Sequence, residues 1–237
     1  MRNGPLAARG SRLAGPGREL LAASLLFAVA ACGPADTAGE DRTRIDDPHA
    51  GIDLESAEPR DAFFAHLQAQ CNEAFAGRLA LEPEGDPMLT GTEELVAHFR
   101  ECTDTEVRIP FHVELEDEGE WDRSRTWYVI HHGDSLELRH DHREPDGSES
   151  TRTWYGGLSA GPGTPFRHDF ASPERTERAG VSVGWRIEIE PGERYSYGTT
   201  YDGEYDWRVD FDLSEPIAEP PPPWGHDTPP SREPGPP

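Results

Sequence analysis

Residues 127–142 read WYVIHHGDSLELRHDH, and this stretch decides the fold. Apolar and polar side chains alternate on both sides of Gly133-Asp134, a dipeptide typical of two-residue β-turns. Such a turn places Trp127 opposite His140 on neighbouring strands. The sequence therefore predicts a β-hairpin with one apolar face and one polar face.

The same alternation continues on both sides of this hairpin. It is clearest in three runs, residues 107–115, 183–189 and 205–213. Shorter runs occur at 75–82, 94–101, 150–156, 166–170 and 194–201. Strands with one wet face are typical of antiparallel sheets, and the turn dipeptides Pro191-Gly192 and Asp202-Gly203 fit hairpin connections.

A helix is expected ahead of the strands. Pro59 suits a first helical position, and Phe63, Leu67 and Cys71 recur every four residues. One helix followed by eight to ten antiparallel strands predicts a mainly β fold. A closed up-and-down β-barrel, in which no strand edge stays unpaired, is preferred. A β-sandwich is the alternative.

This plan resembles the lipocalin-type calycins, which also have a glycine in the first strand, here Gly77 within residues 75–79. Short stretches also look like an uncharacterised family of bacterial secreted proteins: residues 108–111, 122–127, 138–142, 146–149 and 155–157. That second likeness covers most of residues 60–225, and it implies no activity.

The amino terminus has the pattern of an export signal. Basic residues precede residues 20–31, which contain no charged side chain. The end of this run, Val29-Ala30-Ala31-Cys32, resembles the lipobox of bacterial lipoproteins. The resemblance implies that residues 1–31 are a signal peptide, that Cys32 carries lipid, and that the protein is anchored in the cell envelope. By the same analogy, Gly33 favours the outer membrane.

Cysteine usage predicts one disulfide. The chain has 3 cysteines, so Cys71 and Cys102 are left when Cys32 is lipidated. An even pair in an exported domain is typical of a structural disulfide. The alternative is a metal-binding or redox role, although the chain has no Cys-x-x-Cys motif.

Charge and composition set the domain limits. The formal net charge is −24 and every basic residue is arginine, which argues against nucleic acid as a partner. Residues 32–58 are acidic and predict a flexible tether, and 59–215 predict the barrel domain. Residues 216–237 contain ten prolines. This tail is expected either to dock on the domain through Trp224 or to bind a proline-recognising partner.

The predicted hairpin supplies the candidate site. His140 and His142 share the face that carries Trp127, and Arg125 lies on the same face of the neighbouring strand. We expect these four residues to contact a ligand inside the barrel. The two histidines could also hold zinc or copper with a third ligand such as His98 or His112, or have structural roles alone.

No catalytic residue and no cofactor is predicted. Residues 157–161 match the Gly-x-Ser-x-Gly pattern of serine hydrolases, but the prolines that follow prevent the helix that this motif needs. The expected function is a non-catalytic envelope lipoprotein whose barrel binds a small, apolar ligand. The alternatives are a structural or protein-interaction lipoprotein with a filled core and, third, a metal-dependent enzyme.

Overall fold

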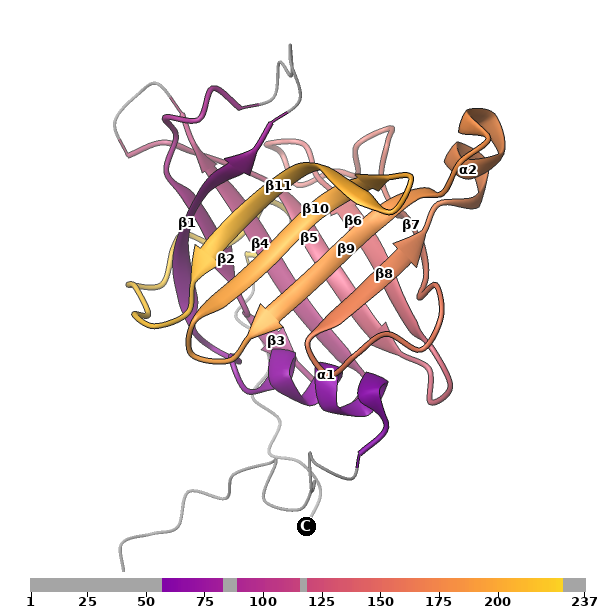
Figure 1. Ribbon diagram of the computed structural model, residues 1–237. Coiled ribbons are helices and arrows are strands. Elements are labelled where there is room, and N and C mark those ends of the chain that lie inside the picture. The colour runs from indigo at the N-terminus through magenta and orange to yellow at the C-terminus, as the bar shows by residue number, and fades with distance from the viewer. Residues whose placement is uncertain (1–56, 83–88, 116–118, 228–237) are drawn as a thin grey trace, which may run out of the picture. The chain divides into compact units, whose positions relative to one another are not determined.

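The computed structural model describes residues 57–82, 89–115 and 119–227. The chain divides into units 1–45 and 46–237, and every described residue belongs to the second. The predicted signal peptide, Cys32 and the tether up to residue 56 lie outside the described residues. The described part is mainly β and forms a nearly closed antiparallel barrel of ten strands (Figure 1). The prediction of a barrel is confirmed, in preference to a sandwich.

The barrel is an up-and-down meander. Its strands neighbour one another in the order β7-β6-β5-β4-β2-β1-β11-β10-β9-β8, and short β3 pairs with β4. The strands are β1 (Ala74–Leu81), β2 (Leu95–His98), β3 (Glu101–Cys102), β4 (Glu106–Glu114), β5 (Trp121–His131), β6 (Leu136–His142), β7 (Tyr155–Leu158), β8 (Arg167–Ala171), β9 (Val183–Glu190), β10 (Arg194–Tyr201) and β11 (Glu204–Asp212). The helices are α1 (Pro59–Gln68) and α2 (Pro173–Ala179).

Most predicted strands lie where alternation placed them, with three differences. The strand expected over 94–101 divides into β2 and β3, because Phe99 and Arg100 leave the ladder between them. The strand expected over 150–156 begins only at Tyr155. In the run 205–213, alternation predicts that Tyr205 shares the inner face with Trp207, but a register shift beside Thr199 turns it outward, where it packs under two arginines.

The half of the barrel interior nearest α1 is filled by apolar side chains. In most of the strands alternate residues point inward, and those near α1 are fully buried, as expected for a closed antiparallel sheet. Examples from five strands are Phe75, Ile109, Leu138, Ile187 and Phe211. Gly77 faces Phe211 across β1 and β11, and a Cβ there would lie 2.3 Å from the phenylalanine ring. The glycine in the first strand therefore makes room for a core aromatic residue.

Helix α1 covers this filled end of the barrel. Its side chains Phe63 and Leu67 are fully buried against the core. Its Asp61 carboxylate lies 2.9 Å from Nε2 of His131 at the end of β5. Helix α2 lies at the other end, because β8 begins near α1 and runs directly into α2 (Figure 1). No side chain of α2 is buried.

The two cysteines of the barrel domain lie at disulfide distance. The sulfur atoms of Cys71 and Cys102 are 2.07 Å apart. The helix was expected to extend along the stripe to Cys71, but it ends at Gln68 and Cys71 lies in the following turn. The pair therefore links this turn to β3.

The first and last strands of the barrel path meet along a short seam. The amide of Ala160 donates to the carbonyl of Asp169 over 2.7 Å, and Ser159 forms an isolated bridge with Phe170. Gly157 allows this approach, because a Cβ there would lie 1.7 Å from the carbonyl oxygen of Ala171. The seam is therefore a close backbone contact between β7 and β8.

The proline-rich segment after β11 lies against the outside of the barrel. The amide of Ile217 donates to the carbonyl of Ala74 in β1. Further along, Nε2 of His112 in β4 donates to the carbonyl of Pro221 over 2.8 Å. Because the segment covers it, His112 is fully buried although it lies on the outer face of the sheet.

The segment continues across β5 to β6. Arg123 donates to the carbonyl of Pro222 over 2.6 Å, and its guanidinium lies 5.9 Å from the Trp224 ring centre. His226 then lies 2.8 Å from the buried carboxylate of Asp141. Of the two expectations for the tail, the structure supports docking for residues 217–226.

Candidate ligand-binding site

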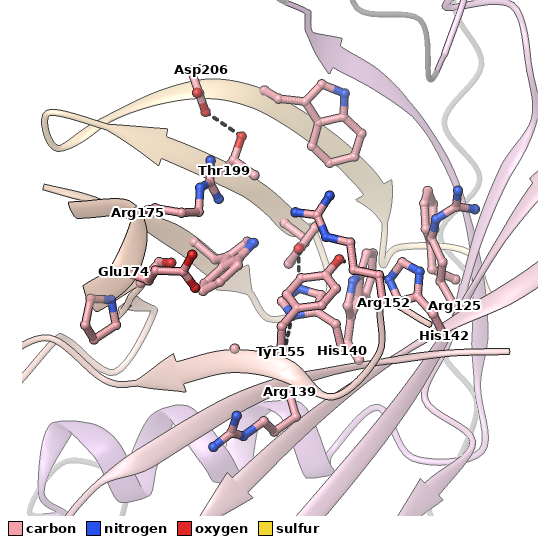
Figure 2. A pocket seen from close by; sticks show the side chains of 18 of the residues that line it. Arg125, Arg139, His140, His142, Arg152, Tyr155, Glu174, Arg175, Thr199 and Asp206 are labelled. Carbon is pink, nitrogen blue, oxygen red and sulfur yellow. Dashed lines mark hydrogen bonds between the residues drawn. The ribbon is translucent and has the colours of Figure 1, made fainter. Parts of the chain in front are cut away.

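A cavity of about 1050 Å³ opens at the α2 end of the barrel. Its wall consists mainly of inward-facing side chains of β4, β5, β6, β9, β10 and β11, together with residues of β7, of α2 and of the loop before β7 (Figure 2). The interior is therefore filled at the α1 end and hollow at the mouth. The sequence was compatible with either a filled or a hollow interior. In the structure one half of the interior is filled and the other half is hollow.

All four residues predicted to contact a ligand line this cavity. Trp127 and Arg125 come from β5, and His140 and His142 come from β6. The predicted hairpin register holds, since Trp127 pairs with His140 and Arg125 with His142. The amide of His132 also donates to the carbonyl of Ser135, as a two-residue turn requires.

His140 is a neutral side chain held by two protein partners. Its Nδ1 lies 3.0 Å from the backbone carbonyl of Tyr155, which can only accept, so Nδ1 carries the proton. Its Nε2 then accepts from the hydroxyl of Tyr197 over 2.5 Å. Burial lowers the pKa of His140 to about 3. Both ring nitrogens are therefore engaged, and the ring offers the cavity a flat neutral surface.

His142 lies nearer the mouth and is only half-buried. Its Nε2 lies 3.1 Å from the hydroxyl of Tyr155. Burial lowers its pKa, and the positive charge of Arg125 adds to the effect. His142 is therefore held neutral beside a tyrosine hydroxyl.

Aromatic rings form the wall of the cavity. The rings of Trp127 and Tyr197 stack with centres 4.1 Å apart. On the other side, His140 and Tyr155 stack with centres 4.6 Å apart and planes 9° from parallel, and Trp185 lies 5.9 Å from Tyr155. Rings fixed against one another in this way give a rigid, mostly apolar surface on which a flat ligand could stack.

The two arginines that the sequence placed close to Trp127 have different roles. Arg125 faces the cavity and donates to Asp122 over 2.5 Å, so its charge is paired. Arg123 faces outward and holds the carboxy-terminal segment. The two side chains therefore cannot hold one anion together.

Sequence reasoning missed several cavity residues. Tyr197 was assigned to a strand but not to the site, and Tyr155, Arg152 and Arg175 were not considered. Tyr155 begins a strand whose predicted limits were shifted, and the two arginines lie in a loop and in a short helix. Periodicity carries no signal for such positions, because a loop has no repeating face and a helix of 7 residues is too short to show one.

The structure does not bring the proposed third metal ligands to His140 and His142. His98 and His112 are on the outer face of β2 and β4, beneath the carboxy-terminal segment. Within residues 57–82, 89–115 and 119–227, no group of three His, Cys, Asp or Glu side chains is arranged to hold a metal ion. Ser159 is the serine of the Gly-x-Ser-x-Gly pattern at residues 157–161. Its hydroxyl accepts a hydrogen bond from the amide of Leu136 in the neighbouring strand.

Comparison with protein-family models, curated proteins and solved structures found no match to this chain. The likeness to calycins therefore rests on the barrel plan alone. Among the described residues, no helix has the length and apolar character needed to cross a membrane.

Proposed function

We propose that this protein is a non-catalytic binding protein whose barrel holds one small, mostly apolar ligand in the mouth cavity. The observation that carries the proposal is a cavity of about 1050 Å³ with aromatic walls in a barrel whose other half is filled. Ligand pockets typically have roughly 300–1000 Å³ and combine an apolar wall with a few placed polar groups. In this cavity aromatic rings supply the apolar wall, and polar and charged side chains make up a larger share of the lining.

We propose that the protein is located in the cell envelope, where a lipid on Cys32 anchors it to the outer membrane. The lipobox-like sequence before Cys32 supports this part of the proposal. Replacement of Cys32 by serine is expected to move the protein from the membrane fraction to the soluble fraction. If the Cys32→Ser protein stays with the membrane, the lipid anchor is wrong.

Binding can be tested with N-phenyl-1-naphthylamine, a neutral aromatic probe that fluoresces when it leaves water. The full chain is expected to bind one probe molecule with saturation. Thr199 lines the cavity between Trp185 and Trp207 on neighbouring strands. A Thr199→Trp variant places a large ring in the cavity and should weaken the probe about tenfold or more, about 1.4 kcal/mol.

Thr105→Trp is the matched control, because Thr105 is exposed and lies at the α1 end, where its carbonyl accepts from His131. This variant should bind the probe like the unchanged protein. Absence of saturable probe binding in the unchanged protein would contradict the proposal. It would favour the structural or protein-interaction alternative.

A further inference from the structure

The mouth cavity carries positive charge in a protein that is strongly negative. Its lining includes Arg125, Arg139, Arg152, Arg175 and Arg178, against only two acids, Glu174 and Asp206. The whole chain has 46 acidic and 22 basic residues. An excess of arginine at this one place therefore runs against the composition of the molecule.

Three of these arginines already have acidic partners. Arg125 pairs with Asp122, Arg178 lies 3.8 Å from Glu174, and Arg139 pairs with Glu137. Arg139 also belongs to the face of β6 opposite to His140, and Figure 2 shows its side chain directed away from the labelled residues around His140. These three charges are therefore at least partly neutralised by the protein itself.

Arg152 and Arg175 differ from the others. In the part of the chain that the structure describes, neither lies within 4.0 Å of a carboxylate, although acidic side chains are abundant. Each guanidinium instead lies over an aromatic ring. Arg152 is 5.5 Å from the centre of Tyr155, and Arg175 is 5.6 Å from the centre of Trp185.

The two rings beneath these arginines are neighbours. The centres of Tyr155 and Trp185 are 5.9 Å apart, so the two guanidinium groups come from separate segments to the same part of the mouth (Figure 2). Stacking on a ring leaves the edge of a guanidinium free to donate hydrogen bonds. Two such edges can hold an anionic group such as a carboxylate or a sulfonate, because two of its oxygens can accept from one guanidinium fork.

The electrostatic effect of this arrangement is visible on a neighbouring group. Burial raises the pKa of the Tyr155 hydroxyl. Three positive charges oppose that rise, in the order Arg152, Arg125 and Arg175. Positive potential at the mouth therefore extends over the aromatic wall on which a ligand would rest.

We propose that the ligand of this cavity is an amphipathic organic acid: its apolar body rests on the aromatic wall, and its anionic group is bound by Arg152 and Arg175. This inference rests on the proposed binding function, and it names the chemical class of the ligand. The acidic group points to the solvent side, where the arginines lie, and the apolar body points toward the filled half of the barrel.

The test compares two probes with the same ring skeleton. 1-Anilinonaphthalene-8-sulfonate carries an anionic group, and N-phenyl-1-naphthylamine lacks it. The full chain is expected to bind the sulfonate at least about tenfold more tightly than the neutral probe, with an affinity that falls as salt rises.

In an Arg152→Gln/Arg175→Gln variant, this preference should disappear while the affinity for the neutral probe changes less than about threefold. The matched control is Arg78→Gln/Arg167→Gln, which removes two exposed arginines that do not line the cavity. It should keep the preference of the unchanged protein.

The outcomes separate the two proposals. If neither probe binds, the binding function itself is wrong. If both probes bind equally well to the unchanged protein, or if the preference does not depend on salt, binding stands and the organic-acid ligand is wrong. The same holds if the Arg152→Gln/Arg175→Gln variant keeps a strong preference for the sulfonate.

Discussion

Gly157 shows how a single residue determines whether the barrel can close. It lies at the contact between β7 and β8, where a Cβ would be only 1.7 Å from the carbonyl oxygen of Ala171. The neighbouring Gly156 is equally confined, with a Cβ position 1.8 Å from the carbonyl oxygen of Leu138 in β6. No side chain fits at either place, so backbone must approach backbone there.

We predict that Gly157→Ala destabilises the protein by about 3 kcal/mol or more, because the added methyl group forces β7 away from β8. Gly133→Asn is the control, since a Cβ at Gly133 meets nothing within 4 Å and asparagine tolerates positive φ. Urea unfolding measures both variants. An unchanged midpoint for Gly157→Ala would show that the seam does not require glycine.

At the scale of elements, the carboxy-terminal segment acts as an additional layer on the sheet. It covers polar side chains that would otherwise face water, and it supplies backbone carbonyl acceptors for three of them, Arg100, His112 and Arg123. His226 then pairs with Asp141, which is 1% exposed and also receives Arg143. The segment therefore links the outer faces of strands far apart in sequence.

A chain that ends at Ser214 lacks six hydrogen bonds between the segment and the barrel. It should be less stable by at least about 3 kcal/mol, since each of them contributes roughly 0.5–1.5 kcal/mol. The barrel itself should remain folded by circular dichroism, because no strand is removed. A chain that ends at Asp227 keeps every tail contact described above and is the control. Equal unfolding midpoints for the two truncated chains would contradict this role.

In the molecule as a whole, the described residues include four histidines that are buried as neutral groups. Burial lowers the pKa of His98, His112 and His168 to about 4 and that of His140 to about 3. In the unfolded chain these side chains titrate near 6.5. Between pH 6.5 and 4 the unfolded state therefore binds more protons, and stability falls as the pH falls.

We predict that this loss begins below pH 6.5, at up to about 1.4 kcal/mol per pH unit for each histidine. Carboxylates with lowered pKa, such as Asp141 and Asp169, stay ionised through this window and add their effect only at lower pH. Urea unfolding at several pH values between 7 and 4.5 measures the slope.

His168→Phe should reduce the slope of unfolding free energy against pH by the contribution of one histidine. Neither ring nitrogen of His168 has a hydrogen-bond partner among the described residues, and the ring packs 4.7 Å from Phe63. Phenylalanine therefore keeps the packing and removes the titrating group. An identical pH dependence in this variant would show that protonation of His168 does not contribute to the loss of stability.

Alternation in the sequence alone predicted most of the strands, the hairpin register and the placement of His140 beside Trp127 on an inner face. These features follow from alternation and turn chemistry, which act between residues close in the chain. Only the tertiary structure decided that β7 meets β8, that the proline-rich segment docks on the sheet, and that Arg152 and Arg175 lie over neighbouring rings. These contacts join residues far apart in sequence, and they depend on how loops and register bring strands around the barrel. No local pattern encodes that path.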